Sequence, residues 1–143
     1  MYLTRLVYAS TKSAEFTYED IEKILQTARK ENKRNNVTGM LCFNRKYFLQ
    51  CLEGSRTKVN ETYHRILNDK RHERIIMLDY REIIQREFDE WKMGYMPESS
   101  LTEPLNLKFS GNLDFSPYEM SGESAHQMML TLKQSALADK LTG

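Results

Sequence analysis

A β-hairpin of two apolar runs is the feature that most limits the folds open to this sequence. Residues 36–54 read NVTGMLCFNRKYFLQCLEG, with a polar tip at residues 44–46 between the runs. In the second run, residues 47–52, every residue except Gln50 is apolar. A strand that is apolar on both faces is usually covered on both faces. We therefore expect a sheet with layers on both sides and a Gln50 side chain that is buried whichever way it points.

A buried glutamine needs partners for its side-chain amide. The amide carries two donor hydrogens and two acceptor lone pairs, and leaving such a group unpaired costs about 1–3 kcal/mol. The partners of Gln50 are either other groups of the protein or a bound molecule with donors and acceptors of its own. The hairpin by itself leaves both interpretations open.

Periodic patterns predict the remaining elements. They are strands at residues 3–10, 74–84 and 91–96 and helices at residues 17–33 and 55–69. Thr17 and Ser55 are the expected N-caps of the two helices. A turn or two of helix near residues 101–109 and a last helix from about Ser121 complete the chain. The order β-α-β-β-α-β-β is the ferredoxin-like pattern of an α+β fold with one extra strand.

The predicted order also suggests how the chain is divided. We expect a first unit at residues 1–96, in which two helices cover one face of the sheet. A C-terminal loop and helical extension at residues 97–143 would pack on the other face. Met120, Met128 and Met129 in this extension are either plain core or an adaptable surface for a partner.

Composition excludes several classes of protein. The net charge of +1 gives no field that would gather nucleic acid or an anionic membrane, so we expect neither as a partner. The sequence shows no signal-peptide layout and no apolar run of membrane-spanning length, which indicates a cytoplasmic protein. Cys42 and Cys51 lie in apolar runs and are expected to be buried free thiols, and the three histidines lack metal-ligand spacing.

Signatures of catalysis are missing as well. The sequence contains no dinucleotide fingerprint, no phosphate-binding P-loop and no nucleophile elbow. We therefore do not expect an enzyme.

Three polar residues stand in apolar settings: Tyr8, Asn32 and Gln50. The first and third strands of a ferredoxin-like sheet are central neighbours, so Tyr8 and Gln50 can lie side by side, facing the helices. Asn32 ends the first of those helices. All three would converge on a groove that suits a flat, apolar ligand with polar edges. The apolar residues expected to line this groove are Ile24, Phe48 and Ile66.

Five motifs in this order resemble the BLUF family, which comprises blue-light sensors that use FAD. The motifs are RLVYAS, Nx3NVTGML, FLQCLEG, Vx3YxRILxDxRH and WxM. They extend from Leu3 to about Met96, and the tail from Leu105 to about Lys133 resembles that of short, single-domain members. The resemblance implies a non-covalently bound FAD, with FMN as the alternative.

The resemblance also implies roles for individual residues. Tyr8 and Gln50 match the photoactive pair of the family, and Asn32 matches its flavin-binding asparagine. Arg65 matches the basic residue that helps to hold the flavin side chain. On this interpretation Gln50 is paired with the flavin ring and with Tyr8.

Trp91 and Met93 match the Trp and Met of the family's last strand, which relays the signal. Because they are two residues apart in a predicted strand, their side chains would share one face, and either could lie next to Gln50. The sequence departs from many members at Glu31, where they carry an amide or an imidazole that can reach the flavin. Arg29 and Lys30 would either offset this carboxylate or serve the FAD phosphates.

The function implied by the resemblance is a light-driven transfer of an electron and a proton from Tyr8 to the flavin. The Gln50 hydrogen bonds then rearrange and shift the absorption to the red. About 45 residues follow Met96, too few for an output enzyme. The signal would pass to another protein or through a dimer or larger homo-oligomer. Two colourless alternatives are a small ferredoxin-like hydrolase, such as an acylphosphatase, and a cofactor-free interaction module.

Overall fold

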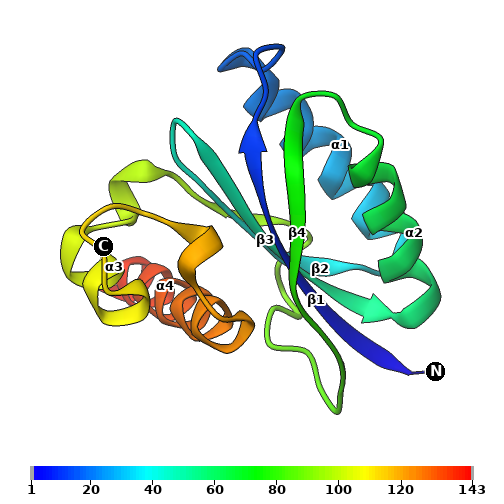
Figure 1. Ribbon diagram of the computed structural model, residues 1–143. Coiled ribbons are helices and arrows are strands. Elements are labelled where there is room, and N and C mark those ends of the chain that lie inside the picture. The colour runs from blue at the N-terminus through cyan, green and yellow to red at the C-terminus, as the bar shows by residue number, and fades with distance from the viewer. Residues whose placement is uncertain (1, 143) are drawn as a thin grey trace.

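A five-stranded sheet separates two helical layers (Figure 1). The computed structural model describes residues 2–142, and their side chains as far as residue 137. The first seven elements are β1 (Leu3–Lys12), α1 (Glu19–Asn35), β2 (Thr38–Phe43), β3 (Tyr47–Ser55), α2 (Arg56–Leu67), β4 (His72–Ile83) and β5 (Gly94–Met96). The C-terminal part consists of the 3₁₀ turns Glu98–Ser100 and Pro117–Glu119 and the helices α3 (Glu103–Ser110) and α4 (Gly122–Thr142).

The strand order is β4-β1-β3-β2-β5. All neighbours are antiparallel except β2 and β5, which are parallel. The first four strands are the ferredoxin-like set and β5 is the extra strand, so the predicted α+β fold is confirmed. β1 and β3 pair in the middle of the sheet, and their register places Tyr8 directly opposite Gln50. Residues directly opposite in an antiparallel pair point to the same face.

Both faces of the sheet are covered, as the apolar hairpin predicts. Figure 1 shows α1 and α2 on one side and α3 and α4 on the other. Two apolar cores result. The core under α1 and α2 includes Leu6, Tyr8, Leu25, Leu41, Leu52 and Met93. The core under α3 and α4 includes Val7, Leu49, Cys51, Phe88, Met128 and Met129.

Side chains on β3 contribute alternately to the two cores, which explains why this strand is apolar throughout. Cys42 and Cys51 are buried and free, as expected. Met120, Met128 and Met129 are all buried. Of the two interpretations of these methionines, plain core is therefore the correct one. Within residues 2–142, no helix is both long and apolar enough to cross a membrane.

The two predicted helix caps had different outcomes. Ser55 caps α2, since its Oγ accepts a hydrogen bond from Lys58 N at 3.3 Å. The prediction for Thr17 is wrong, because α1 begins later, with Tyr18 at the N-cap position. The Asp20 carboxylate instead accepts from the Thr17 backbone N at 2.8 Å and from its hydroxyl at 3.1 Å. The Thr17–Asp20 pair therefore closes the turn through which the chain enters α1.

The prediction for residues 91–96 is also partly wrong. Only Gly94–Met96 form a strand, and the chain turns before it, since Trp91 N donates to Phe88 O at 3.0 Å. Trp91 packs against the core under α3 and α4, whereas Met93 belongs to the core under α1 and α2. The two side chains do not share one face, because the alternation of an extended strand does not apply in the turn.

Candidate functional site

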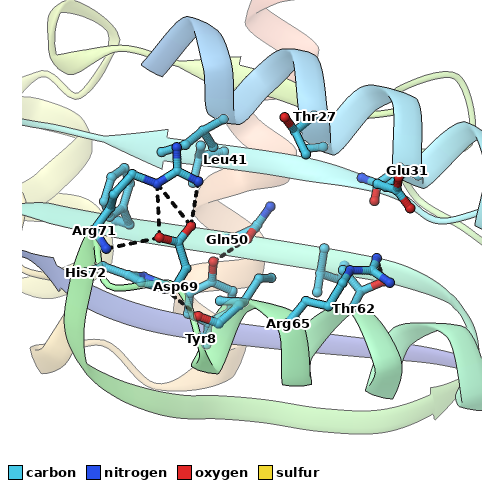
Figure 2. Close-up of a pocket in the computed structure, with 16 residues that line it drawn as sticks. Tyr8, Thr27, Glu31, Leu41, Gln50, Thr62, Arg65, Asp69, Arg71 and His72 are labelled. Atoms are coloured by element: carbon cyan, nitrogen blue, oxygen red, sulfur yellow. Dashed lines mark hydrogen bonds and ion pairs between the residues drawn. The ribbon is translucent and has the colours of Figure 1, made fainter. Parts of the chain in front are cut away.

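A cavity of about 400 Å³ lies between α1, α2 and the sheet. Seven residues that the sequence singled out all line it: Tyr8, Ile24, Asn32, Phe48, Gln50, Arg65 and Ile66. Figure 2 shows Gln50 and Tyr8 from the sheet, Thr27 and Glu31 from α1, and Thr62 and Arg65 from α2. Ala28, Leu41 and Leu52 add to its apolar walls. Its volume is within the range of sites that hold small molecules and cofactors.

The Tyr8 and Gln50 side chains are bonded to each other on the floor of the cavity (Figure 2). The Tyr8 hydroxyl donates to Gln50 Oε1, and the two residues are only 3% and 6% exposed. Burial, assisted by the nearby Tyr63 and Asp69, raises the pKa of Tyr8 far above its ordinary value. The phenol is therefore neutral and acts as the donor in this bond. The β1–β3 register produces the pair, because it places the two residues opposite each other.

The other end of the Gln50 amide contacts Met93. Gln50 Nε2 donates to Met93 Sδ at 3.3 Å, and Met93 is 2% exposed. A thioether sulfur is a weak acceptor, and the amide nitrogen has a second hydrogen to donate. Among the described residues, these two contacts are the hydrogen bonds that the side chain makes. The amide thus has donor capacity left for a molecule in the cavity.

The last turns of α1 hold the backbone that leads into β5. Asn32 is 2% exposed, and its Nδ2 donates to Lys92 O at 2.7 Å. Arg29 Nε donates to Met93 O at 3.1 Å. The Asn32 bond uses one of the two N–H donors of this amide, so its oxygen and its second N–H are available to a ligand. Neither Arg29 nor Lys30 is among the described residues that line the cavity, whereas Glu31 is.

Charged and polar side chains also line the cavity (Figure 2). Arg65 Nη2 donates to Thr62 Oγ1 at 3.3 Å, and most of its five N–H donors remain for an anionic group. Near Tyr8, the Arg71 guanidinium forms a hydrogen-bonded ion pair with the Asp69 carboxylate, and the shortest N–O distance is 2.7 Å. These Arg71 hydrogen bonds lower the pKa of Asp69 below its ordinary value.

His72 is fixed beside this ion pair. Its Nδ1 lies 2.8 Å from Ser10 Oγ and its Nε2 lies 2.8 Å from Ile66 O. The sequence patterns predicted no role for Asp69, Arg71 or His72, all of which line the cavity. The signal that could have identified them is the D-x-R-H end of the fourth motif.

Sequence comparison finds one family over most of the chain. The family described as "BLUF: Sensors of blue-light using FAD" matches residues 3–94. The blue light- and temperature-regulated antirepressor BluF of Escherichia coli K12 is 37% identical over 76 residues, which are 53% of this chain and 19% of that protein. The chain thus spans about a fifth of the length of this curated relative, and 12% or less of the photoactivated adenylate cyclases of Euglena.

Two solved structures match this chain over nearly its whole length. The structure titled "BlsA photo-activated state" covers 91% of this chain and 94% of its own, at 30% identity and a TM-score of 0.82. The BLUF protein BlrB in its dark state covers 94% and 97%, at 26% identity and a TM-score of 0.78. A bacterial light-regulated adenylyl cyclase is 38% identical, with a TM-score of 0.62, over 66% of this chain and 27% of its own.

Proposed function

The chain belongs to the BLUF family of blue-light sensors using FAD, and from this premise we propose that it is a photoreceptor whose flavin is a non-covalently bound FAD in the cavity between α1, α2 and the sheet. The observation that carries the proposal is the buried Tyr8–Gln50 pair on the cavity floor. Gln50 combines a firm bond to a neutral phenol with a weak one to a sulfur atom, which suits an amide that exchanges partners.

The residues of the cavity fit a flavin. Ile24, Phe48 and Ile66 supply apolar walls for a flat ring system, and the Gln50 and Asn32 amides can bond its polar edge. Arg65, which lines the cavity and is exposed, suits the phosphates of the flavin side chain. Cys42 and Cys51 belong to the opposite core, where burial raises the pKa of both thiols, so neither is placed to form a covalent link.

The bound flavin supplies the absorption of blue light and, once excited, a strong oxidant. Tyr8, which lies on the cavity floor and is hydrogen-bonded to Gln50, would donate the electron. Because its phenol is neutral, loss of an electron must be accompanied by release of the hydroxyl proton, and Gln50 Oε1 is placed to accept it. Once the electron and the proton had returned to Tyr8, the Gln50 amide would be left rotated, tautomerised or both. A stronger bond from this amide to a ring carbonyl would shift the absorption to the red.

The output is proposed to be a change of contacts and not a reaction. A few altered hydrogen bonds amount to about 1–3 kcal/mol, enough to bias an interface. Relatives carry this module within longer proteins, including a cyclase and an antirepressor. Here we propose that residues 97–143 are an extension packed on the module at residues 1–96. Through it the signal would reach a partner protein or a second copy of the chain.

One spectrum tests the proposal. The purified protein is expected to be yellow, and the flavin released on denaturation should run as FAD in chromatography beside an FMN standard. Blue light should move the absorption to longer wavelength, and darkness should reverse the change. A colourless protein that takes up neither FAD nor FMN would favour the hydrolase or the interaction module instead.

Gln50→Leu is expected to keep the flavin and lose the reversible red shift. Leucine keeps most of the buried volume but has no hydrogen bonds to exchange. The measurement is the light-minus-dark absorption difference, with exposed Gln127→Leu on α4 as the matched control. A normal photocycle in Gln50→Leu would show that this amide is not the switch.

Asn32→Ala is expected to weaken flavin binding by roughly tenfold, the value of one well-made hydrogen bond to a ligand. It also removes the bond to Lys92 O that holds the chain before β5. A fluorescence titration of apoprotein with FAD measures the affinity, and exposed Lys33→Ala on the same helix is the control. Equal affinities in the two variants would exclude Asn32 from the binding site.

A further inference from the structure

Glu53 is a buried carboxylate that takes no part in the proposed photochemistry of Tyr8 and Gln50. It lies three residues after Gln50 on β3 and is 0% exposed. An odd spacing along a strand places two side chains on opposite faces, so Glu53 points away from the flavin cavity. Burying a carboxylate is costly unless hydrogen bonds or charges compensate for the lost water.

The closest partners of the Glu53 carboxylate come from the loop between β4 and β5, and the Thr38 hydroxyl on β2 donates to it at 3.5 Å. The carboxylate accepts from the backbone N–H groups of Glu87 and Phe88, each with a shortest distance of 2.8 Å. Arg86 fastens the same loop, since its Nη1 donates to Thr38 Oγ1 at 2.9 Å and to the Glu53 carbonyl at 3.1 Å. Burial raises the pKa of Glu53, while the two backbone bonds and the charge of Arg86 act in the opposite direction.

The chain segment that starts at Arg86 ends at Met93, the residue that contacts Gln50. Met93 accepts the Gln50 amide hydrogen bond at 3.3 Å. Between these points, Trp91 O accepts from Gly39 N at 2.9 Å and Lys92 O accepts from the Asn32 side chain at 2.7 Å. Residues 86–93 therefore form one tethered segment, with Glu53 at one end and Gln50 at the other.

The Glu53 end of the segment also contacts the C-terminal helix. Lys133 on α4 donates from its Nζ to Glu87 O, and the same Nζ lies 5.6 Å from the centre of the Phe88 ring. Glu87 thus donates its N–H to Glu53 and accepts from α4 with its carbonyl. The segment is thus a hydrogen-bonded connection between the amide that switches and the helix that lies on the far face of the sheet.

We propose that Glu53 is a positioning residue of the light switch, which fixes residues 86–93 so that a change at the Gln50–Met93 contact reaches α4 through Glu87 and Lys133. The inference rests on the proposed function, since it concerns the step after the rearrangement of Gln50. Fixed by Glu53, the segment passes a displacement at Met93 on to α4. Released from Glu53, the loop would absorb that displacement locally and α4 would not respond.

Glu53→Gln in the full chain tests the proposal. The variant keeps the side-chain volume but replaces one acceptor oxygen with an NH₂ group that faces backbone donors. Flavin binding and the red shift should persist, because Glu53 lies outside the cavity. In the dark, hydrogen exchange at Glu87 and Phe88 should become about tenfold faster or more, as expected for loss of a charge-assisted bond.

The decisive readout is light-minus-dark hydrogen exchange over residues 122–137, with the fluorescence of Trp91, the single tryptophan, as a second signal. Both differences should be present in the wild type and absent in Glu53→Gln. Asp79→Asn is the matched control, because Asp79 is also a largely buried carboxylate but is paired with Arg5 and Arg81 and not with the segment. Asp79 lies beside Gly122 at the start of α4, so this variant also shows whether the loss of any buried charge near the helix abolishes the response. Its light response should match the wild type.

The light response of α4 in the two variants decides whether Glu53 positions the segment. A Glu53→Gln protein whose α4 responds to light as the wild type does would overturn the proposal, and so would an Asp79→Asn protein that loses the response equally. If Glu53→Gln does not fold, half-buried Arg86→Met removes the second fastening of the loop and should weaken the α4 response with the red shift intact. An unchanged response in Arg86→Met would then overturn the proposal. A wild type without any red shift would instead overturn the proposed function itself.

Discussion

Tyr8→Phe should retain the flavin and lose the reversible red shift completely. The Tyr8 ring packs in the core under α1 and α2, with the Tyr63 ring centre 5.8 Å away, and a phenylalanine ring would keep this packing. The hydroxyl is the group that donates to Gln50, so the variant has no proton to release. A phenyl ring is also a far poorer electron donor than a phenol. The measurement is the absorption difference under blue light at matched flavin occupancy.

Tyr63→Phe provides the control for this prediction. Tyr63 is a neighbouring tyrosine of the same core and is 9% exposed, but Gln50 bonds Tyr8 and not Tyr63. Its photocycle should stay close to that of the wild type. Tyr8→Phe also leaves Gln50 Oε1 without its donor, so its free energy of unfolding should fall by about 1–3 kcal/mol. A red shift that survives in Tyr8→Phe would assign the electron donor to another residue.

The parts of the fold that could be predicted are those fixed by strong local patterns. An uninterrupted apolar run at residues 47–52 required cover on both faces, and the structure supplies it. The pairing of Tyr8 with Gln50 follows from the central position of the first and third strands in a ferredoxin-like order. The cavity residues come from the same register and from the apolar stripes of two amphipathic helices.

The parts that could not be predicted depend on contacts between distant backbone groups. The closest partners of Glu53 are backbone amide hydrogens 34 and 35 residues further along the chain, and backbone donors have no signature in a sequence. The sequence patterns predicted no role for Glu53, although it stands in the motif FLQCLEG. The turn at Phe88–Trp91 was missed for the same reason, since residues 91–96 alone alternate in the manner of a strand.

The turn changes what Trp91 and Met93 can do. A Cβ on Gly94 would lie 1.9 Å from the Trp91 ring, so this glycine is what allows the indole to lie across the chain. The indole packs against Phe88, with ring centres 6.3 Å apart, on the α4 side of the sheet. Of Trp91 and Met93, it is Met93 that forms a hydrogen bond with Gln50. The relay that the resemblance assigned to either residue is therefore proposed to start at Met93, with Trp91 further along the same segment.

Rotation of the Gln50 amide would change the Met93 contact directly. In the present arrangement the amide nitrogen donates to Met93 Sδ. A half-turn about the amide would bring the oxygen to the sulfur, and neither atom has a hydrogen to share. A tautomer that keeps a hydrogen on the nitrogen would leave the contact in place. Met93 can thus respond to a rotated amide, and its backbone leads through residues 86–92 to α4.

Met93→Ala should therefore keep the flavin and most of the red shift but uncouple them from the C-terminal part. The readouts are light-minus-dark hydrogen exchange over residues 101–133 and the oligomer size in solution. Because Met93 is 2% exposed, the truncation should also lower the free energy of unfolding by about 2–5 kcal/mol, so Met93→Leu must be measured beside it. Leucine restores most of the volume without the sulfur acceptor. Loss of the response in both variants would assign the relay to the sulfur contact, and loss in Met93→Ala alone would assign it to packing. A Met93→Ala protein whose C-terminal helices respond to light as in the wild type would remove Met93 from the output path.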